Sequence, residues 1–171
     1  KDLVYQTNVF GTRELCFSLK YWAEQFHQKI PRLAYISSDY VFNGTKWNYH
    51  PGDRVDPVPN NYYALTKALG EAYVKSYDPH LIIRTSFCRG DIWPHEAAFT
   101  DQFTSRDTIE VIAPKISALI NSKATGIKHV GTERKSVYDL ARRINPNVKP
   151  MSRLEIQCVN IPYDTSLYLD D

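Results

Sequence analysis

The first part of the chain carries apolar residues at helical spacing. Leu15, Leu19, Trp22 and Phe26 fall at positions i, i+4, i+7 and i+11, so their side chains share one face of a helix. Pro31 closes the segment because proline cannot continue a helix. The pattern therefore predicts a helix that packs this apolar face against a sheet.

Two short apolar runs follow, and each changes abruptly to polar residues. Residues 33–36 lead into residues 37–39 (Ser-Ser-Asp), and residues 81–83 lead into residues 84–86 (Arg-Thr-Ser). Such runs are typical of buried parallel strands, and a second helical pattern at residues 62–77 separates them. The order helix, strand, helix, strand predicts an α/β fold with a parallel sheet and helices on its faces. Ligands of such sheets bind at the carboxyl ends of the strands, where both polar segments fall.

The second half of the chain is less regular. Residues 88–106 mix Gly, Pro, aromatic and charged residues, which predicts a long excursion that could cover a site. The stripe at residues 109–119 predicts a third amphipathic helix that packs on the core, and residues 128–130 predict a short strand. Ser136 is a plausible N-cap for a last helix at residues 137–144.

The composition describes one globular domain without a strong electric field. A chain of 171 residues with 43% hydrophobic and 23% charged residues is long enough for one core and short for two. The 21 basic and 19 acidic residues leave a net charge of +2, so nothing favours nucleic acid or an anionic membrane surface. No run approaches the roughly 18 apolar residues of a membrane span. Three distant cysteines and scattered histidines predict neither a disulfide framework nor a metal site.

Tyr63 and Lys67 are four residues apart and share one face of the second predicted helix. A phenol with a pKa near 10 is a poor acid or base at neutral pH, and a nearby ammonium is expected to lower that pKa. The hydroxyl of Ser38 could bind the same substrate oxygen, so the three groups could polarise a carbonyl while a nicotinamide delivers hydride. With 12 tyrosines in the chain, a Tyr-x-x-x-Lys match is expected about once by chance, so the prediction depends on its placement after a buried strand.

The residues around this pair match a known family in two blocks. Residues 35–44 (Tyr-Ile-Ser-Ser-Asp-Tyr-Val-Phe-Asn-Gly) precede residues 59–71, which contain Asn-Tyr-Tyr-Ala-Leu-Thr-Lys and Gly-Glu. They resemble the extended short-chain dehydrogenase/reductases of the dTDP-4-dehydrorhamnose reductase branch. Members of that branch show Ser-Thr-Asp-Tyr-Val-Phe-Asp-Gly, followed by Asn-x-Tyr-Gly-x-Ser-Lys and Gly-Glu. Residues 8–12, 82–86 and 162–167 resemble further segments of the family, so the resemblance spans nearly the whole chain.

The resemblance implies a Rossmann-like reductase that uses NADPH or NADH to reduce a nucleotide-linked 4-keto-6-deoxy sugar. Tyr63 would donate the proton, Lys67 would assist it, Ser38 would hold the substrate carbonyl, and Asn8 would be a fourth catalytic position. The implied cofactor contacts are Ser37, Tyr63, Lys67, Arg84, Thr85 and Ser86. The implied substrate contacts are Ser38, Asp39, Tyr40, Val41 and Phe87, the last of which stands where the family often has Trp.

One departure from the family is large. The superfamily binds its dinucleotide through a Gly-x-x-Gly-x-x-Gly turn after the first strand, and none of the seven glycines of this chain form that cluster. The resemblance therefore predicts an N-terminally truncated chain that binds dinucleotide weakly or not at all by itself. Residues 1–87 would be the later part of a dinucleotide-binding domain. Residues 88–171 would form a small substrate-binding subdomain together with returning core elements.

Two other functions stay open at this point. The superfamily uses the same Tyr-Lys pair in nucleotide-sugar epimerases and dehydratases, and Asp39 stands where dehydratases place an acid. A non-catalytic regulatory subunit resembling the beta subunit of methionine adenosyltransferase is the second alternative. Arg106 and Gln102 are expected to be solvated loop residues rather than nucleotide contacts. The expected setting is the cytoplasm, with a nucleotide-sugar partner, no nucleic acid or membrane and, as one option, a homodimer.

Overall fold

Three parallel strands form the central sheet of the computed structural model, which describes residues 2–156 and 161–169. The strands are β1 (Leu33–Ser38), β2 (His80–Thr85) and β7 (Gly126–Val130), in the order β1-β2-β7. All three predicted strands are present, and β1 and β2 continue into their polar segments because those residues still pair across the sheet. The carboxyl ends of β1 and β2 therefore lie side by side.

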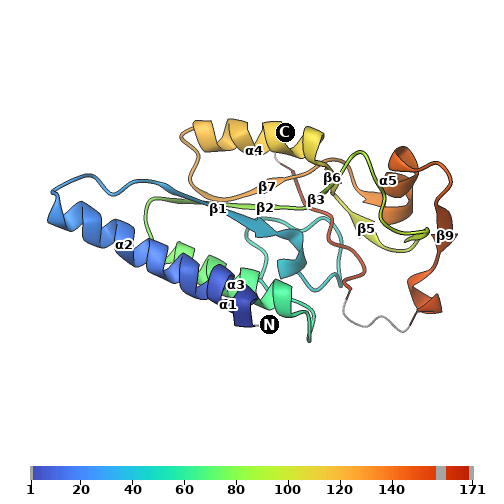
Figure 1. Cartoon of the computed structure of the whole chain (residues 1–171), viewed down its shortest axis with the longest axis horizontal. Helices are drawn as coiled ribbons and strands as arrows, with labels where there is room; N and C mark the ends of the chain where they lie inside the picture. Colours follow the sequence, from blue (N-terminus) through green and yellow to red (C-terminus); the bar gives the residue numbers. More distant parts are fainter. Residues whose placement is uncertain (1, 157–160, 170–171) are drawn as a thin grey trace.

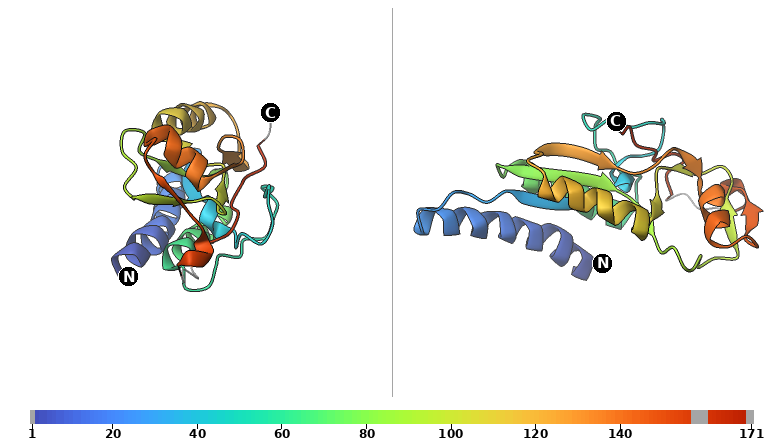
Figure 2. Two further views of the ribbon diagram at one scale, coloured as in Figure 1. Left: turned by 90° about the vertical axis from the view of Figure 1, so that its right-hand side faces the viewer. Right: turned by 90° about the horizontal axis from the view of Figure 1, so that it is seen from above.

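Helices cover both faces of this sheet (Figures 1 and 2). One face carries α2 (Thr12–Gln25) and α3 (Tyr62–Lys75), and the opposite face carries α4 (Ile109–Asn121). A short helix α1 (Asp2–Tyr5) and the π-helical turn η1 (Gln6–Gly11) lead into α2. Among the described residues, no helix combines the length and the apolar character that crossing a membrane requires. The predicted α/β fold is confirmed.

Side chains on the two faces of strand β2 pack into two separate hydrophobic cores. Ile82 packs toward α2 and α3 in a cluster with Cys16 and Tyr77, whereas Leu81 and Ile83 pack toward α4 on the other face. This follows from the alternation of side chains along a strand. Each buried aliphatic side chain contributes roughly 1.5–3 kcal/mol, so the two cores hold the helices on the sheet.

Helix α2 packs with a different face from the predicted one. Leu15, Trp22 and Phe26 are 47%, 44% and 64% exposed, whereas Cys16 is buried. Of the predicted stripe, only Leu19 packs against the core. The prediction is wrong for the other three because the helix approaches α3 and the sheet through smaller side chains, which leaves the large ones outside.

The rest of the chain builds a smaller lobe beside the sheet. Strand β4 (Ala97–Phe99) pairs in parallel with β9 (Lys149–Met151), and β5 (Phe103–Thr104) pairs antiparallel with β8 (Lys135–Ser136). Helix α5 (Val137–Ile144) follows β8, and the side chain of its N-cap residue accepts a hydrogen bond from the backbone of the first turn, as predicted. The predicted excursion at residues 88–106 thus contains two short strands of this lobe.

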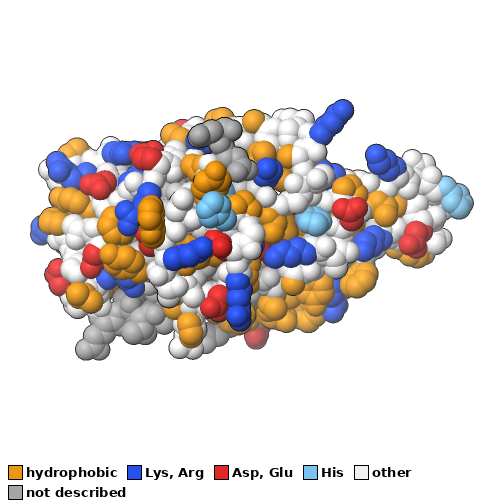
Figure 3. All heavy atoms as spheres, turned by 180° about the vertical axis from the view of Figure 1, so that it is seen from behind, with side chains coloured by type: hydrophobic (Ala, Val, Ile, Leu, Met, Phe, Trp, Pro, Cys, Tyr) orange, Lys and Arg blue, Asp and Glu red, His pale blue; other side chains and the backbone are white. Residues whose placement is uncertain are grey.

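Short elements connect the lobe to the sheet. Strand β3 (Phe87–Cys88) continues beyond β2 and pairs with β6 (Asp107–Thr108), and the 3-10 turn η2 (Asp39–Val41) follows β1 directly. A further 3-10 turn, η3 (Arg153–Glu155), lies near the end of the lobe. Figure 3 shows basic, acidic and hydrophobic side chains intermixed on one face of the molecule, in keeping with the small net charge.

Candidate active site

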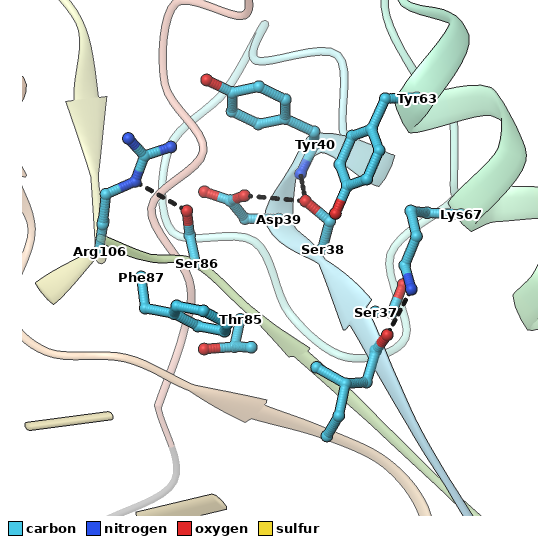
Figure 4. A pocket seen from close by; sticks show the side chains of 11 residues that line it. Ser37, Ser38, Asp39, Tyr40, Tyr63, Lys67, Thr85, Ser86, Phe87 and Arg106 are labelled. Atoms are coloured by element: carbon cyan, nitrogen blue, oxygen red, sulfur yellow. Dashed lines mark hydrogen bonds between the residues drawn. The ribbon is translucent and has the colours of Figure 1, made fainter. Parts of the chain in front are cut away.

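A cavity of about 380 Å³ opens at the carboxyl ends of β1 and β2 (Figure 4). Its walls come from these two strand ends, the turn η2, helix α3 and the segment between β5 and β6. The lining residues are Ile36, Ser37, Ser38, Asp39, Tyr40, Tyr63, Lys67, Thr85, Ser86, Phe87 and Arg106. All predicted site residues except Asn8, Val41 and Arg84 therefore lie around one space.

Ser38 sits where β1 turns into η2. Its hydroxyl oxygen accepts a hydrogen bond from the backbone N–H of Tyr40 at 3.1 Å, which caps the turn. The same hydroxyl donates to Oδ1 of Asp39 at 3.3 Å. In the sheet, Ser38 pairs with Thr85, so the two hydroxyl groups enter the cavity from adjacent strands.

Helix α3 brings Tyr63 and Lys67 to the same cavity. The side chain of Asn61 accepts a hydrogen bond from the N–H of Ala64 at 3.0 Å and thereby begins the helix just before the pair. One turn separates the two residues, and Figure 4 shows the Tyr63 hydroxyl turned toward Ser38. The ammonium of Lys67 donates to the carbonyl of Ile36 at 2.5 Å, which ties the helix to β1. The predicted grouping of a hydroxyl, a phenol and an ammonium is therefore present.

Burial dominates the acid–base properties of this pair. It raises the pKa of the Tyr63 phenol above its usual value, and a hydrogen bond with Ser38 offsets only part of this. Burial also lowers the pKa of Lys67, against the opposing charge of Glu71. The sequence predicted that the ammonium lowers the pKa of the phenol. That direction is wrong for the structure as it stands, and the phenol is fully protonated at neutral pH.

Arg106 is a cavity residue, although the sequence suggested a solvated loop position. Its side chain is partly buried, and its Nε donates to the hydroxyl of Ser86 at 2.9 Å. Asp39 lies nearby and accepts a hydrogen bond from the hydroxyl of Thr165 at 2.7 Å. Burial raises the pKa of Asp39, and the charge of Arg106 opposes that shift. No local motif marks Arg106, because only the fold of the lobe brings it to the sheet.

Three predicted site residues lie away from the cavity. Arg84 is 0% exposed, and its Nε and Nη2 donate to the two carboxylate oxygens of Glu71 at 2.9 and 2.8 Å. Val41 is equally buried and belongs to a core cluster. Both side chains are fully buried, and neither lines the cavity around which the other predicted residues lie. The amide of Asn8 donates to the hydroxyl of Thr66 at 3.0 Å and supports α3 from behind.

A second cavity of about 390 Å³ adjoins the first one. Tyr40 and Arg106 line both cavities, and the rest of the second wall is largely apolar and comes from the smaller lobe. Its other lining residues are Trp93, His95, Ala97, Ala98, Phe99, Gln102, Val137, Met151, Ile156 and Ile161. Gln102, expected to be solvated, is buried and donates to the carbonyl of Pro162 at 3.4 Å. This cavity could not be predicted from the sequence because its residues come from segments that lie far apart along the chain.

The described part of the chain contains no group of three or more His, Cys, Asp or Glu side chains that could hold a metal ion. Two cysteines in that part, Cys16 and Cys88, are free thiols. The third, Cys158, lies outside the described residues. The chemistry of the site is therefore argued from its hydroxyl, phenol, ammonium and guanidinium groups.

Several known proteins resemble the chain, among them proteins described as reductases of dTDP-linked sugars. A curated relative, the dTDP-4-keto-6-deoxy-D-glucose reductase of Streptomyces niveus, is 30% identical over 131 residues, which cover 65% of this chain and 44% of the relative. A solved structure described as a hypothetical dTDP-4-dehydrorhamnose reductase from Sulfolobus tokodaii is 29% identical, with a TM-score of 0.74. That match covers 96% of this chain and 63% of the other.

A second solved structure confirms the Rossmann-like fold. The dTDP-4-dehydrorhamnose reductase of Bacillus anthracis, solved in complex with NADP, has a TM-score of 0.77 at 24% identity and covers 99% of this chain and 64% of the other. The chain thus spans less than two thirds of each of these relatives. A family model described as the RmlD substrate binding domain matches residues 18–113, more than half of the sequence. The chain therefore belongs to the RmlD substrate binding domain family.

Proposed function

We propose that this chain carries the catalytic part of an NAD(P)H-dependent reductase whose substrate is a nucleotide-linked 4-keto-6-deoxy sugar. The observation that carries the proposal is the convergence of Ser38, Tyr63 and Lys67 on one cavity at the strand ends. Relatives named as dTDP-sugar reductases support the same substrate class. Among the described residues that line the cavity, the one acidic side chain is Asp39, which is already hydrogen-bonded to Ser38 and Thr165.

The proposed reaction turns a ketone into an alcohol. NADPH or NADH supplies the hydride to the carbonyl carbon, and the carbonyl oxygen then needs a proton. Tyr63 carries its proton at neutral pH because the pKa of a phenol lies near 10 and burial raises it further, so the proton is available for transfer to the oxygen. Ser38 holds the oxygen by a hydrogen bond. Lys67 stabilises the phenolate that Tyr63 leaves behind, which favours proton transfer.

The residues of the cavity fit the nicotinamide end of such a cofactor. The hydroxyl of Thr85 is buried in the cavity wall and has no hydrogen-bond partner among the described residues, so it has capacity for a ligand. The hydroxyl of Tyr63 and the ammonium of Lys67 face the same space. The glycine-rich turn that would hold the pyrophosphate has no counterpart in this sequence. We therefore assign only the nicotinamide and its ribose to Lys67, Thr85 and neighbouring residues.

The two adjoining cavities suit the two ends of a nucleotide sugar. The sugar would occupy the first cavity beside Tyr63, and the base would enter the apolar second cavity of the smaller lobe. Arg106 lies between them, and a guanidinium is well suited to bind a diphosphate through charge-assisted hydrogen bonds. From the resemblance to dTDP-sugar reductases we also propose a cytoplasmic setting, with a homodimer as one option for the assembly.

A fusion of this chain with part of a relative tests this function. The chain is joined to the part of the Sulfolobus tokodaii relative that the match does not cover, and NADPH consumption is followed with a dTDP-linked 4-keto-6-deoxy sugar. We expect turnover, and we expect Tyr63→Phe to lower kcat by roughly two orders of magnitude because the acid is removed. Tyr62→Phe is the matched control, since Tyr62 does not line the cavity, and its kcat should equal that of the parent.

Two outcomes contradict the proposal. An unchanged kcat in Tyr63→Phe removes the phenol from proton transfer. Conversion of the sugar without net consumption of NADPH indicates an epimerase or dehydratase instead.

Binding of dTDP to the chain alone, measured by calorimetry, tests the proposed substrate site separately. Arg106→Met should weaken that binding about tenfold or more, because a charged hydrogen bond is lost.

A further inference from the structure

The ammonium of Lys67 lies over the face of an aromatic ring. Its Nζ is 4.3 Å from the ring centroid of Tyr35, which points from β1 toward α3. The same Nζ donates to the carbonyl of Ile36, the next residue of the strand. Tyr35 is partly buried and packs against the core cluster between the sheet and α2. Two consecutive residues of β1 thus hold one ammonium, one through its ring and one through its carbonyl.

The ring has room in this place only because position 70 is glycine. Gly70 lies one turn after Lys67 on α3, and a Cβ at that position would collide with the hydroxyl of Tyr35. It would also lie 2.9 Å from Cζ of the ring and 2.9 Å from the backbone oxygen of Asn8. The backbone oxygen cannot move away as a flexible side chain can. The Tyr35 side chain therefore contacts two positions of α3. Its ring lies against Lys67, and its hydroxyl end lies against Gly70.

We propose that Tyr35 is a positioning residue that holds the Lys67 ammonium at the cavity through its ring face, and that Gly70 exists to admit that ring. The importance of Tyr35 for catalysis rests on the proposed function. The contact between its ring and the Lys67 ammonium does not depend on that function. A ring face attracts an ammonium most strongly where water is excluded, as it is at this partly buried site. The ring would thereby keep Lys67 charged and in place at the cavity wall, although burial works against the charge.

The other titratable groups around Lys67 do not replace this contact. Glu71 lies one turn further along α3, but both of its carboxylate oxygens accept hydrogen bonds from Arg84. Tyr63 precedes Lys67 on the same helix, and burial raises its pKa, so it is neutral. Burial likewise raises the pKa of Tyr35 itself, which keeps its hydroxyl uncharged. The ring face is therefore the contact that a substitution at position 35 changes.

The experiment is an NMR titration of the chain with lysine labelled with ¹³C at Cε, in which Lys67→Arg assigns the Lys67 signal. Tyr35→Leu should lower the pKa of Lys67 by about half a unit to one unit, since leucine excludes water but offers no ring face. Tyr35→Phe keeps the ring and should leave that pKa unchanged. The titration needs neither NADPH nor sugar, so its result is independent of whether the reductase activity is found.

Variants at Gly70 approach the same contact from the other side. Gly70→Ala should displace the ring and lower the pKa of Lys67 as Tyr35→Leu does, together with a lower melting temperature. Combining Gly70→Ala with Tyr35→Leu should recover part of the melting temperature, because the collision with the ring is gone, but not the pKa. Gly52→Ala is the matched control, since no atom would lie within 4 Å of its Cβ.

Three results overturn the proposal. The first is a wild-type pKa of Lys67 in Tyr35→Leu. The second is an equal drop in Tyr35→Phe and Tyr35→Leu, which would assign the effect to the hydroxyl. If Tyr35→Leu does not fold, the test depends on Gly70→Ala. The third contradicting result is then a Lys67 pKa in Gly70→Ala equal to that of the wild type.

Discussion

The carboxyl ends of β1 and β2 are similar in sequence, but their side chains have different structural roles. Both are polar, both were predicted to contact a ligand, and they pair in register, with Ser37 opposite Arg84 and Ser38 opposite Thr85. At the end of β1, both serines line the cavity. At the end of β2, Thr85 lines it, whereas Arg84 turns away into a buried ion pair with Glu71 of α3.

The difference shows that polarity at a strand end does not by itself identify a ligand contact. Ser37 and Arg84 are register partners, so their side chains project from the same face of the sheet, and the length of the side chain separates them. A short hydroxyl next to the cavity stays there, but the long side chain of Arg84 reaches a carboxylate on the covering helix. It also donates to the carbonyl of Pro51 at 3.1 Å. Arg84 therefore holds the helix that carries Tyr63 and Lys67.

The largest expected effect comes from breaking this ion pair. Arg84→Ala leaves the buried carboxylate of Glu71 without its two hydrogen bonds and with only the half-exposed Lys75, at 3.6 Å, as a counter-charge, and we expect the free energy of unfolding to fall by about 3 kcal/mol. Urea unfolding of the chain measures it. Replacing Arg84 and Glu71 together by Met is the control. Because no buried charge is left alone, the double variant should recover most of the loss. A loss as large in the double variant as in Arg84→Ala would contradict a structural role for the ion pair.

The sequence was sufficient to predict the sheet and most of the candidate site. Local periodicity predicted β1, β2 and α3, and the i, i+4 spacing placed Tyr63 and Lys67 together, because such features depend on neighbours along the chain. Arg106 and the second cavity could not be predicted. They depend on how the smaller lobe folds back on the sheet, which involves residues far apart in sequence.

The direction of the Tyr63 pKa was missed for a related reason. The i, i+4 spacing shows that an ammonium is near but not how much water reaches the phenol. In the structure, burial outweighs the nearby charges. The face of α2 was also missed, since its stripe of large apolar residues is regular but the packing surface is set by the approach of α3. Solvent exclusion is a property of the assembled fold.

At the end of β1, the corresponding change affects activity rather than stability. Ser38→Ala removes the hydroxyl proposed to hold the substrate oxygen, and we expect kcat of the joined enzyme to fall about 10- to 100-fold. Because the hydroxyl also caps η2, the free energy of unfolding should fall by only about 1 kcal/mol. Ser38→Thr keeps the hydroxyl and is the control. A kcat in Ser38→Ala equal to that of the parent would place Ser38 outside the reaction.

Acid should weaken the buried ion pair between Arg84 and Glu71. Burial raises the pKa of Glu71, but the hydrogen bonds and the charge of Arg84, together with the charge of Lys75, outweigh burial and hold the pKa below its usual value. The unfolded chain then binds more protons than the folded one, so the stabilisation is complete above a pH of about 4.3 and is lost as the pH falls through the lower, folded value.

Urea unfolding of the wild type and Glu71→Gln between neutral pH and pH 3 checks this dependence. The difference in free energy of unfolding between them should be largest at neutral pH and should shrink in acid. A difference that stays constant over this range would mean that Glu71 is not the group that titrates.

The smallest effect is expected from an ion pair that resembles the buried one only in its geometry. Arg89 donates to both carboxylate oxygens of Asp91, at 3.0 and 2.7 Å, yet both side chains are well exposed. Water screens such a pair, and holding two mobile side chains together costs entropy that offsets the attraction. Arg89→Ala should therefore leave the urea midpoint unchanged, in contrast to Arg84→Ala. A midpoint that falls as far as in Arg84→Ala would show that hydrogen-bond geometry, and not burial, sets the difference between these two pairs.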